Sequence, residues 1–286
     1  KWDDGKPDPH PPDVIVEAFG CGLPEAYVRD MVRAVRPPLW IVLEYLSAES
    51  WVHEHHRLPS PHPGLALERY FFFPGFGAGT GGLLREGDLL ARRDAFGDTQ
   101  RAAFWQSIDQ RAPTRDVAVI SLFGYEGAPL TQLMRCWEQG PRPTVLVVPP
   151  STMLPLALEY CGSGDDSVGR VLQRGALELR TIPFLPQVRY DELLWSCDCN
   201  FVRGEDSIVR AQWAAKPCVW HIYPQADRAH ERKLDAFLTL YTASLPQTAR
   251  RAVSGMMQAW NQTAGPAVTP AAAWTAYADQ LGLLRE

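Results

Sequence analysis

Short apolar runs that do not alternate with polar residues most constrain the fold of this 286-residue chain. Val117-Ala-Val-Ile120 and Val145-Leu-Val-Val148 are apolar at every position, as expected for strands that are covered by helices on both faces. Segments with helical spacing separate such runs along the chain, and this pattern is typical of parallel α/β structure. We therefore predict an α/β protein with two Rossmann-like lobes around a cleft.

The predicted elements fall on both sides of Arg111-Ala-Pro-Thr-Arg115, which interrupts the pattern. Strands are expected at 13–19, 39–46, 70–73, 116–123, 144–148, 177–182, 200–202 and 218–223. Helices are expected at 24–34, 88–108, 129–138, 152–161, 190–195, 207–215, 227–241, 249–261 and 271–283. The proline-rich segment 58–64 is expected to be a rigid loop. We predict one lobe at 1–110, a second at 111–262, and a helix within 263–286 that packs back on the first lobe.

Composition excludes several classes of protein. Lys and Arg number 28 and Asp and Glu number 33, so the formal net charge is −5, which argues against a nucleic-acid-binding protein. No apolar run reaches the ~18 residues of a membrane-spanning helix, and no signal peptide is evident. The chain starts without Met in a proline-rich loop at 1–12 that runs directly into a strand, so we interpret the sequence as entered partway through the protein.

The six cysteines are scattered and none has CxxC spacing. A chain of this length buries a core without disulfides, so reduced thiols in the cytoplasm are expected. Cys197 and Cys199 share one face of a predicted strand, and we interpret them as packing residues rather than zinc ligands.

Arg203-Gly204-Glu205-Asp206-Ser207 lies where an apolar strand runs into a helix. A helix N-terminus offers unpaired amides and a partial positive charge, which suit a diphosphate. Gly204 would let the backbone approach that anion, and the planar guanidinium of Arg203 could bind it, with Glu205 beside it. The residues alone leave an alternative open, in which Asp206 or Ser207 only caps the helix and Arg203 pairs with Glu205.

Aromatic residues follow two other predicted strands. Phe123 and Tyr125 come after one strand, and Phe184 and Gln187 come after a later one. The carboxyl ends of parallel strands share one edge of a sheet, so these residues are expected to lie close together. An aromatic face with an amide that donates and accepts suits a nucleobase. The alternative is that the aromatic residues belong to the core.

Two further patterns carry less weight. Gly77-Ala-Gly-Thr-Gly-Gly82 matches GxGxxG, but Pro74 interrupts the strand-to-helix transition of a dinucleotide-binding fingerprint, so we interpret this run as a flexible glycine loop at the cleft. His53-Glu-His-His56, with His62 nearby, lacks HExxH spacing and is interpreted as a solvated helix end rather than a metal site. The absence of GxSxG weakens a serine-hydrolase interpretation.

Several long strings in a fixed order give the chain a specific resemblance. They are Val16-Glu-Ala-Phe-Gly-Cys21, Leu43-Glu-Tyr-Leu-Ser-Ala-Glu49, Tyr70-Phe-Phe-Phe-Pro-Gly-Phe76, Thr80-Gly-Gly-Leu-Leu-Arg-Glu86, Ser121-Leu-Phe123 with Tyr125-Glu126, 200–207, and Val219-Trp-His-Ile-Tyr-Pro-Gln225. The chain resembles the bacterial protein-arginine rhamnosyltransferases that modify elongation factor P, the EarP family. The resemblance implies a GT-B type fold, in which two Rossmann-like lobes face a cleft.

The resemblance also implies an activity and its partners. Members of this family are inverting glycosyltransferases that move L-rhamnose from dTDP-β-L-rhamnose to an arginine of elongation factor P. The implied reaction uses no metal and no cofactor besides the donor substrate, and it takes place in the cytoplasm without a nucleic-acid or membrane partner. The lobe at 1–110 would then be the acceptor side, and the lobe at 111–262 would bind the nucleotide sugar.

Carried over residue by residue, the resemblance assigns the donor site. Binding of thymidine and its sugar falls to Phe123, Tyr125, Phe184 and Gln187. The diphosphate motif falls on Arg203, Gly204, Glu205, Asp206 and Ser207. Glu205 is the implied catalytic carboxylate, and we expect it to orient the acceptor guanidinium and take its proton late.

This sequence departs from the family at its start. Family members carry there a strand-to-helix loop with an Asp assigned as general base, and no segment here matches it, so that role is given to no residue. We expect that an upstream segment is omitted from the recorded sequence. Two alternatives remain, namely another GT-B glycosyltransferase with a different nucleotide sugar and acceptor, or a non-catalytic protein that binds a nucleotide sugar.

Overall fold

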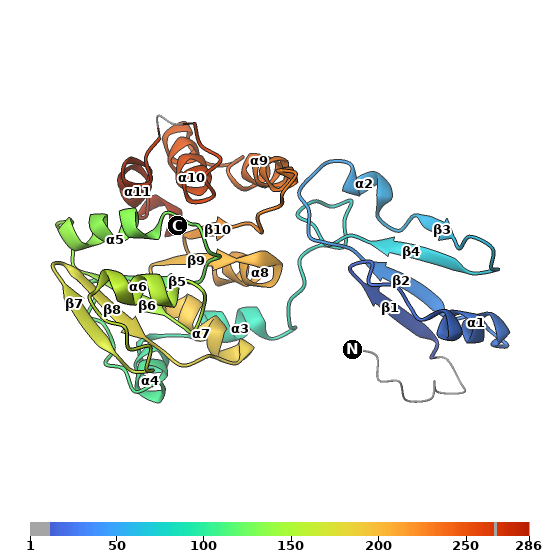
Figure 1. Cartoon of the computed structure of the whole chain (residues 1–286), viewed down its shortest axis with the longest axis horizontal. Helices are drawn as coiled ribbons and strands as arrows, with labels where there is room; N and C mark the ends of the chain where they lie inside the picture. The colour runs from blue at the N-terminus through green and yellow to red at the C-terminus, as the bar shows by residue number, and fades with distance from the viewer. Residues whose placement is uncertain (1–11, 266–267, 286) are drawn as a thin grey trace. The chain divides into compact units, whose positions relative to one another are not determined.

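The structure, a computed structural model, describes residues 12–265 and 268–285 (Figure 1). The chain divides into two compact units, Lys1–Leu84 and Arg85–Glu286. Each unit contains a mostly parallel sheet, so the prediction of an α/β protein with two lobes is confirmed. Of the loop predicted at 1–12, only Pro12 lies within the described residues.

The first unit contains a four-stranded sheet in the order β1-β2-β4-β3. Its strands are β1 (Val14–Ala18), β2 (Leu39–Leu43), β3 (Pro59–Pro61) and β4 (Glu68–Phe72), and its helices are α1 (Glu25–Arg33) and α2 (Val52–His55). Strands β1, β2 and β4 run parallel, whereas β3 pairs antiparallel with β4. The predicted proline loop thus contains a short strand, and β3 tolerates its prolines because it lies at a sheet edge.

The second unit contains a six-stranded sheet in the order β10-β9-β5-β6-β8-β7. Its strands are β5 (Ala118–Leu122), β6 (Thr144–Val148), β7 (Val171–Arg174), β8 (Leu177–Thr181), β9 (Cys199–Arg203) and β10 (Cys218–His221). Only β7 runs antiparallel to its neighbour among these strands. We did not predict β7, which lies at the edge and is largely exposed, so no apolar run marks it.

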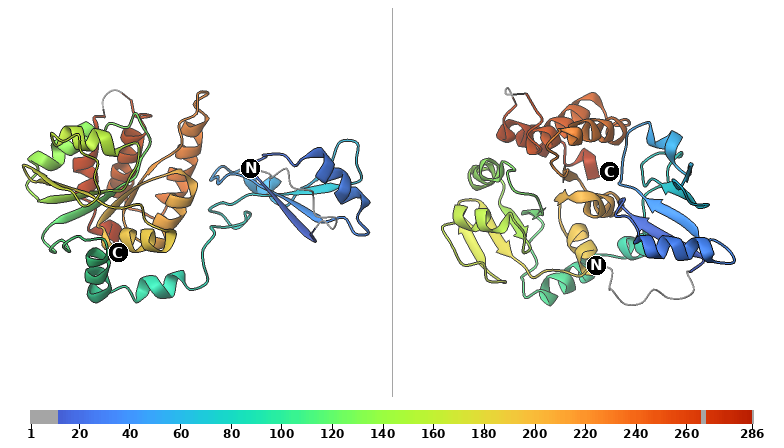
Figure 2. Two further views of the ribbon diagram at one scale, coloured as in Figure 1. Left: turned by 60° about the horizontal axis from the view of Figure 1, so that its bottom comes forward. Right: turned by 45° about the vertical axis from the view of Figure 1, so that its right-hand side comes forward.

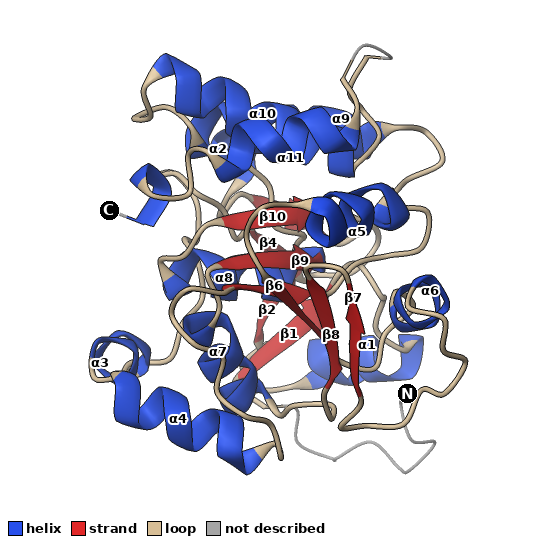
Figure 3. Cartoon of the chain, turned by 90° about the vertical axis from the view of Figure 1, so that its left-hand side faces the viewer, coloured by secondary structure: helices blue, strands red, loops and turns tan. Residues whose placement is uncertain are grey.

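Helices cover both faces of this second sheet (Figure 3). They are α3 (Leu89–Asp94), α4 (Asp98–Ser107), α5 (Leu130–Gln139), α6 (Leu154–Tyr160), α7 (Gln187–Ser196), α8 (Gly204–Ala214), α9 (Ala229–Tyr241), α10 (Gln247–Trp260) and α11 (Pro270–Ala278), with a final 3₁₀ turn at Leu283–Arg285. On one face, Val119 and Val145 pack against residues of α4 and α7. On the other face, Phe201 meets Trp137 of α5 and Trp260 of α10.

Two features differ from the predicted boundaries. The helix predicted at 88–108 is two helices, because Gly97 has an extended backbone at the start of α4. The compact units divide after Leu84, whereas we predicted a boundary after residue 110. The reason lies in α4, whose Phe104 and Trp105 are buried against the second sheet.

The helices that end the chain gather on one side of the second sheet, as the orange and red segments in the right-hand view of Figure 2 show. We predicted that the helix within 263–286 packs back on the first lobe. In the structure, α11 packs against α10 and α5 of its own unit. The rings of Trp274 and Trp137 meet edge-on, with their centroids 5.4 Å apart. None of the helices within the described ranges is long and apolar enough to cross a membrane.

The strand order of the second unit creates a switch point. From β5 the chain adds β6 and β8 on one side, and then returns to add β9 and β10 on the other side. The connections that leave β5 and β9 therefore diverge, and in open α/β sheets ligands bind at the carboxyl ends of such strands.

Candidate functional site

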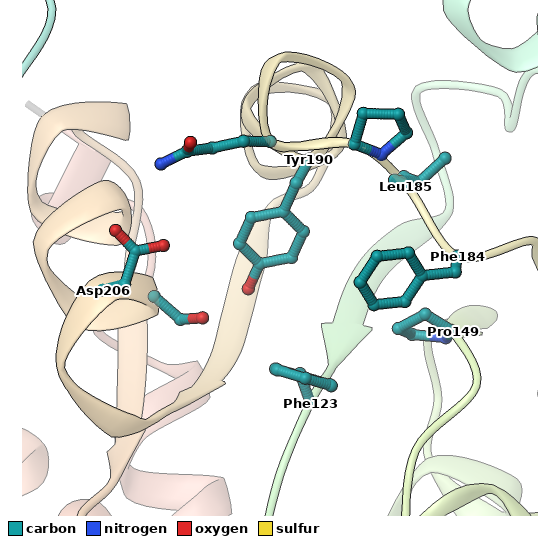
Figure 4. A pocket seen from close by; sticks show the side chains of 9 residues that line it. Phe123, Pro149, Phe184, Leu185, Tyr190 and Asp206 are labelled. Atoms are coloured by element: carbon teal, nitrogen blue, oxygen red, sulfur yellow. The ribbon is translucent and has the colours of Figure 1, made fainter. Parts of the chain in front are cut away.

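A pocket of about 520 Å³ opens at the carboxyl ends of these strands (Figure 4). Its lining comes from the segments after β5, β6 and β8 and from the starts of α7 and α8, namely Phe123, Pro149, Phe184, Leu185, Pro186, Gln187, Tyr190, Asp206 and Ser207. The pocket belongs entirely to the second unit. Five of its residues are among those that the sequence assigns to the donor site, which are Phe123, Phe184, Gln187, Asp206 and Ser207.

The aromatic residues of the pocket are not core residues. The Phe184 side chain is 74% exposed, and Phe123 is half-buried. In Figure 4, Phe184 lies across the opening from Asp206 of α8, and Phe123 lies below the two. An exposed aromatic ring at the mouth of a pocket offers a stacking surface for a planar ligand.

Tyr190 is a pocket residue that the sequence analysis missed. It points into the pocket from α7, between Asp206 and Phe184 (Figure 4). Its hydroxyl is shielded from solvent and makes no hydrogen bond of acceptable geometry within the described residues, although Ser207 lies beside it. Because α7 begins at Gln187 rather than at residue 190, Gln187 and Tyr190 are one turn apart on one helical face.

Arg203 forms a cluster with two aromatic rings beside the pocket. Its guanidinium carbon lies 4.3 Å from the ring centroid of Phe123 and 4.9 Å from that of Tyr125. Such stacking leaves the edge of the guanidinium available for hydrogen bonds to an anion.

The diphosphate segment begins α8 one turn earlier than we predicted. The helix starts at Gly204, so Glu205 and Asp206 lie inside its first turn rather than before it, and Ser207 lies within the helix rather than at its start. Arg203 occupies the N-cap position, and no side chain caps the helix. The alternative in which Asp206 or Ser207 caps α8 is therefore wrong, and the first amides of the helix remain available to a ligand.

Gly204 is required by its backbone conformation. Its φ is +66°, and a Cβ there would lie 3.1 Å from the hydroxyl oxygen of Tyr125. The carbonyl oxygen of Gly204 accepts a hydrogen bond from Nε1 of Trp220 at 2.8 Å. The strand-to-helix turn is thus held in a conformation that favours glycine.

His221 at the end of β10 contacts Tyr125 of this cluster. It is 3% exposed, and its Nδ1 accepts a hydrogen bond from the backbone N–H of Tyr125 at 3.1 Å. Burial, with the positive charge of Arg203 and a smaller effect of His230, lowers the pKa of His221 to about 4. The imidazole is therefore neutral at pH 7, as an acceptor at Nδ1 requires.

The structure thus gathers the predicted residues into two adjoining groups. Five line the pocket, while Tyr125, Arg203 and Gly204 form the cluster beside it, linked through Phe123. Glu205 is half-buried in the first turn of α8. The two groups place rings, a guanidinium and free amides at one sheet edge, a set that can bind an aromatic base joined to an anion.

The patterns given less weight belong to the first unit. A side chain at Gly77 or Gly79 would overlap the ring of His53, so these glycines allow close packing of the loop. Nδ1 of His56 accepts a hydrogen bond from the backbone N–H of Phe73 at 3.1 Å. Within residues 12–265 and 268–285, no three His, Cys, Asp or Glu side chains group as a metal site would need.

The cysteines pack as free thiols. All six are free, and Cys197, Cys199 and Cys218 are buried. Cys197 belongs to the core between α4, α7 and the sheet, as predicted for a packing residue.

Comparison with known proteins assigns the chain to a family. The profile of the family described as "Elongation-Factor P (EF-P) rhamnosyltransferase EarP" matches residues 1–286. A protein-arginine rhamnosyltransferase of Pseudomonas putida is 48% identical over 253 residues, which are 88% of this chain and 67% of the relative. One from Pseudomonas aeruginosa is 44% identical over 255 residues, again 88% of this chain and 67% of the relative. The chain thus spans about two thirds of these relatives' length.

A solved structure agrees with these matches. It is described as the "Structural basis for EarP-mediated arginine glycosylation of translation elongation factor EF-P", and it is 35% identical with a TM-score of 0.68. The likeness covers 93% of this chain and 73% of that one, so the predicted GT-B type fold class is confirmed. On family profile, relatives and fold together, the chain belongs to the EarP family of protein-arginine rhamnosyltransferases, which are glycosyltransferases.

Proposed function

We propose that this protein transfers L-rhamnose from dTDP-β-L-rhamnose to an arginine side chain of elongation factor P, with inversion at the anomeric carbon. The observation that carries the donor part is the pocket at the switch point, where exposed Phe184 faces the uncapped start of α8. The base and sugar would lie among Phe123, Phe184, Gln187 and Tyr125. The acceptor part rests on the family and on the substrate named for the related structure.

In the proposed reaction, the bond between the anomeric carbon and the β-phosphate oxygen breaks as a bond to an arginine nitrogen forms. The departing dTDP gains negative charge, and Arg203 with the first amides of α8 would stabilise it. The proposal therefore needs no cofactor besides the donor. Glu205 would orient the acceptor guanidinium, which is protonated at neutral pH, and would accept the proton that it loses as the new bond forms. We place the reaction in the cytoplasm, where elongation factors act.

Calorimetric titration tests the donor part. We expect selective binding of dTDP-β-L-rhamnose over UDP-N-acetylglucosamine. Arg203→Ala removes a charge-assisted contact that is worth about 1.5–3 kcal/mol, so donor affinity should fall roughly 10- to 150-fold. Equal binding of the two nucleotide sugars would point to another GT-B transferase, and binding of neither would refute the donor site.

Glu205→Gln tests the catalytic part. The variant should bind dTDP as the wild type does and fail to add a rhamnosyl group to elongation factor P, measured by the mass of the acceptor protein. Glu159→Gln is the matched control, because Glu159 is exposed near the end of α6 and does not line the pocket. Unchanged transfer by Glu205→Gln would refute its catalytic role. A wild-type protein that binds the donor and transfers nothing would favour a non-catalytic binding protein.

A further inference from the structure

A buried ion-pair network lies behind the α7–α8 wall of the pocket. Arg210 of α8 is 7% exposed and Asp191 of α7 is 2% exposed. Nη1 of Arg210 donates to both carboxylate oxygens of Asp191, at 2.8 and 2.9 Å, and its Nη2 donates to Oε1 of Glu86 at 2.6 Å. Arg92 also approaches Asp191, with Nη2 at 3.5 Å from Oδ2.

Stability alone does not explain this network. Burial raises the pKa of Asp191 despite its hydrogen bonds to Arg210, which reflects the cost of removing the carboxylate from water. A buried ion pair contributes little net stability compared with an apolar replacement, so we consider what else this network positions.

The remaining edge of the Arg210 guanidinium meets Gln187, the pocket residue at the start of α7. One terminal atom of the Gln187 carboxamide faces Nε and Nη2 of Arg210, and with the amide oriented to satisfy its neighbours this atom is Oε1, 2.6 Å from Nε. A guanidinium only donates hydrogen bonds, so the carboxamide must present its oxygen to Arg210. The NH₂ group of Gln187 is then the part of this side chain left for a ligand in the pocket.

We propose that Arg210 is a positioning residue that holds the Gln187 carboxamide with its NH₂ group toward the donor nucleotide. This wall would then select a base whose facing edge carries a carbonyl oxygen, as thymine and uracil do, over one that carries an amino group, as cytosine does. The inference rests on the proposed donor site, and it adds to that site an expected selectivity among pyrimidines.

Gln187→Glu is the sharpest test. The introduced carboxylate keeps an oxygen for Arg210 and replaces the NH₂ donor by a second acceptor. Gln187 is exposed, so the fold should tolerate the change. The added charge acts equally on two diphosphates, so the measured quantity is the ratio of affinities for dTDP and dCDP, obtained by titration calorimetry. We expect at least a tenfold preference for dTDP in the wild type and at least a tenfold fall in this ratio in the variant.

Arg210→Lys tests the role of Arg210 while leaving Gln187 unchanged. Lysine keeps a positive charge for Asp191 and Glu86 but lacks the planar edge that holds the carboxamide, so the amide can turn and the ratio should fall about three- to tenfold. Arg92→Lys is the matched control, because Arg92 approaches Asp191 and has no contact with Gln187 among the described residues, and its ratio should stay at the wild-type value. Thermal unfolding of each variant checks the fold. If Arg210→Lys does not fold, Arg210→Gln takes its place with the same expected fall, and Gln187→Glu still decides whether the amide selects the base.

The outcomes separate this inference from the proposed function. Wild-type protein that binds neither nucleotide would overturn the donor site and the inference with it. Wild-type protein that binds dTDP and dCDP equally, or a Gln187→Glu ratio equal to that of the wild type, would overturn the inference and leave the donor site standing. An unchanged ratio in folded Arg210→Lys, or an equal fall in Arg92→Lys, would remove the positioning role from Arg210.

Discussion

Mild acid should destabilise the second unit through His221. The folded protein holds this imidazole neutral with a pKa of about 4, whereas in the unfolded chain it takes its ordinary value of 6.5. A lowered folded pKa means that the unfolded chain binds a proton first as the pH falls, so stability is lost from about pH 6.5 downward. For pKa values of 6.5 and about 4, linkage gives a loss of about 2 kcal/mol by pH 5 and about 3 kcal/mol below pH 4.

His221→Asn isolates this contribution. The Oδ1 atom of asparagine can take the place of Nδ1 as the acceptor for the Tyr125 N–H, and asparagine does not titrate. Urea unfolding at pH 7.5 and at pH 5 measures the loss of unfolding free energy for each protein. Other groups titrate equally in both, so the wild type should lose about 2 kcal/mol more than the variant over this interval. Equal losses would refute the assignment of a neutral, buried His221.

Two substitutions test the pocket and the turn beside it. Phe184→Ala should leave the free energy of unfolding within about 0.5 kcal/mol of the wild-type value, because the side chain is 74% exposed. The binding free energy of dTDP should weaken by about 1–3 kcal/mol, because the stacking contact is lost. Calorimetry and urea unfolding measure the two quantities, and a large stability loss with unchanged affinity would make Phe184 a core residue. Gly204→Ala should lower stability by about 1–2 kcal/mol, because φ is +66° and the new Cβ would crowd the Tyr125 hydroxyl. An unchanged urea midpoint would contradict this strain.

The sequence predicts the inner strands of the second sheet well, and a physical reason separates them from the strand that it misses. Strands β5 and β6 are covered on both faces, so their apolar runs mark them within two residues. Edge strand β7 has polar, exposed residues and leaves no such mark. The extent of each unit was also not predictable, because it depends on the sheet against which α4 packs. The sequence shows that Phe104 and Trp105 are apolar, but it does not show which lobe buries them.

Part of the site was predictable from the order of the strands, and part depended on where two helices begin. Phe123, Phe184 and Gln187 could be grouped because the carboxyl ends of parallel strands share an edge. Both helices that flank the pocket start one turn earlier than predicted, at Gln187 and at Gly204, and neither N-cap side chain makes a capping hydrogen bond that a sequence pattern could reveal. Starting α7 at Gln187 would have indicated Tyr190, which lies one turn further on.

The role of Arg210 was not predictable from the sequence, because its ion pair with Asp206 is local but its other partners come from other segments. Glu86 precedes it by 124 residues, and only the packing of α7 against α8 brings Asp191 and Gln187 to the same guanidinium. The resulting pocket has two unlike walls. The exposed ring of Phe184 must become ordered when a base stacks on it, which costs free energy on binding, whereas the Gln187 amide is already oriented by buried charges. The stacking wall therefore accepts any base, and discrimination among bases falls to the wall that is fixed before the ligand arrives.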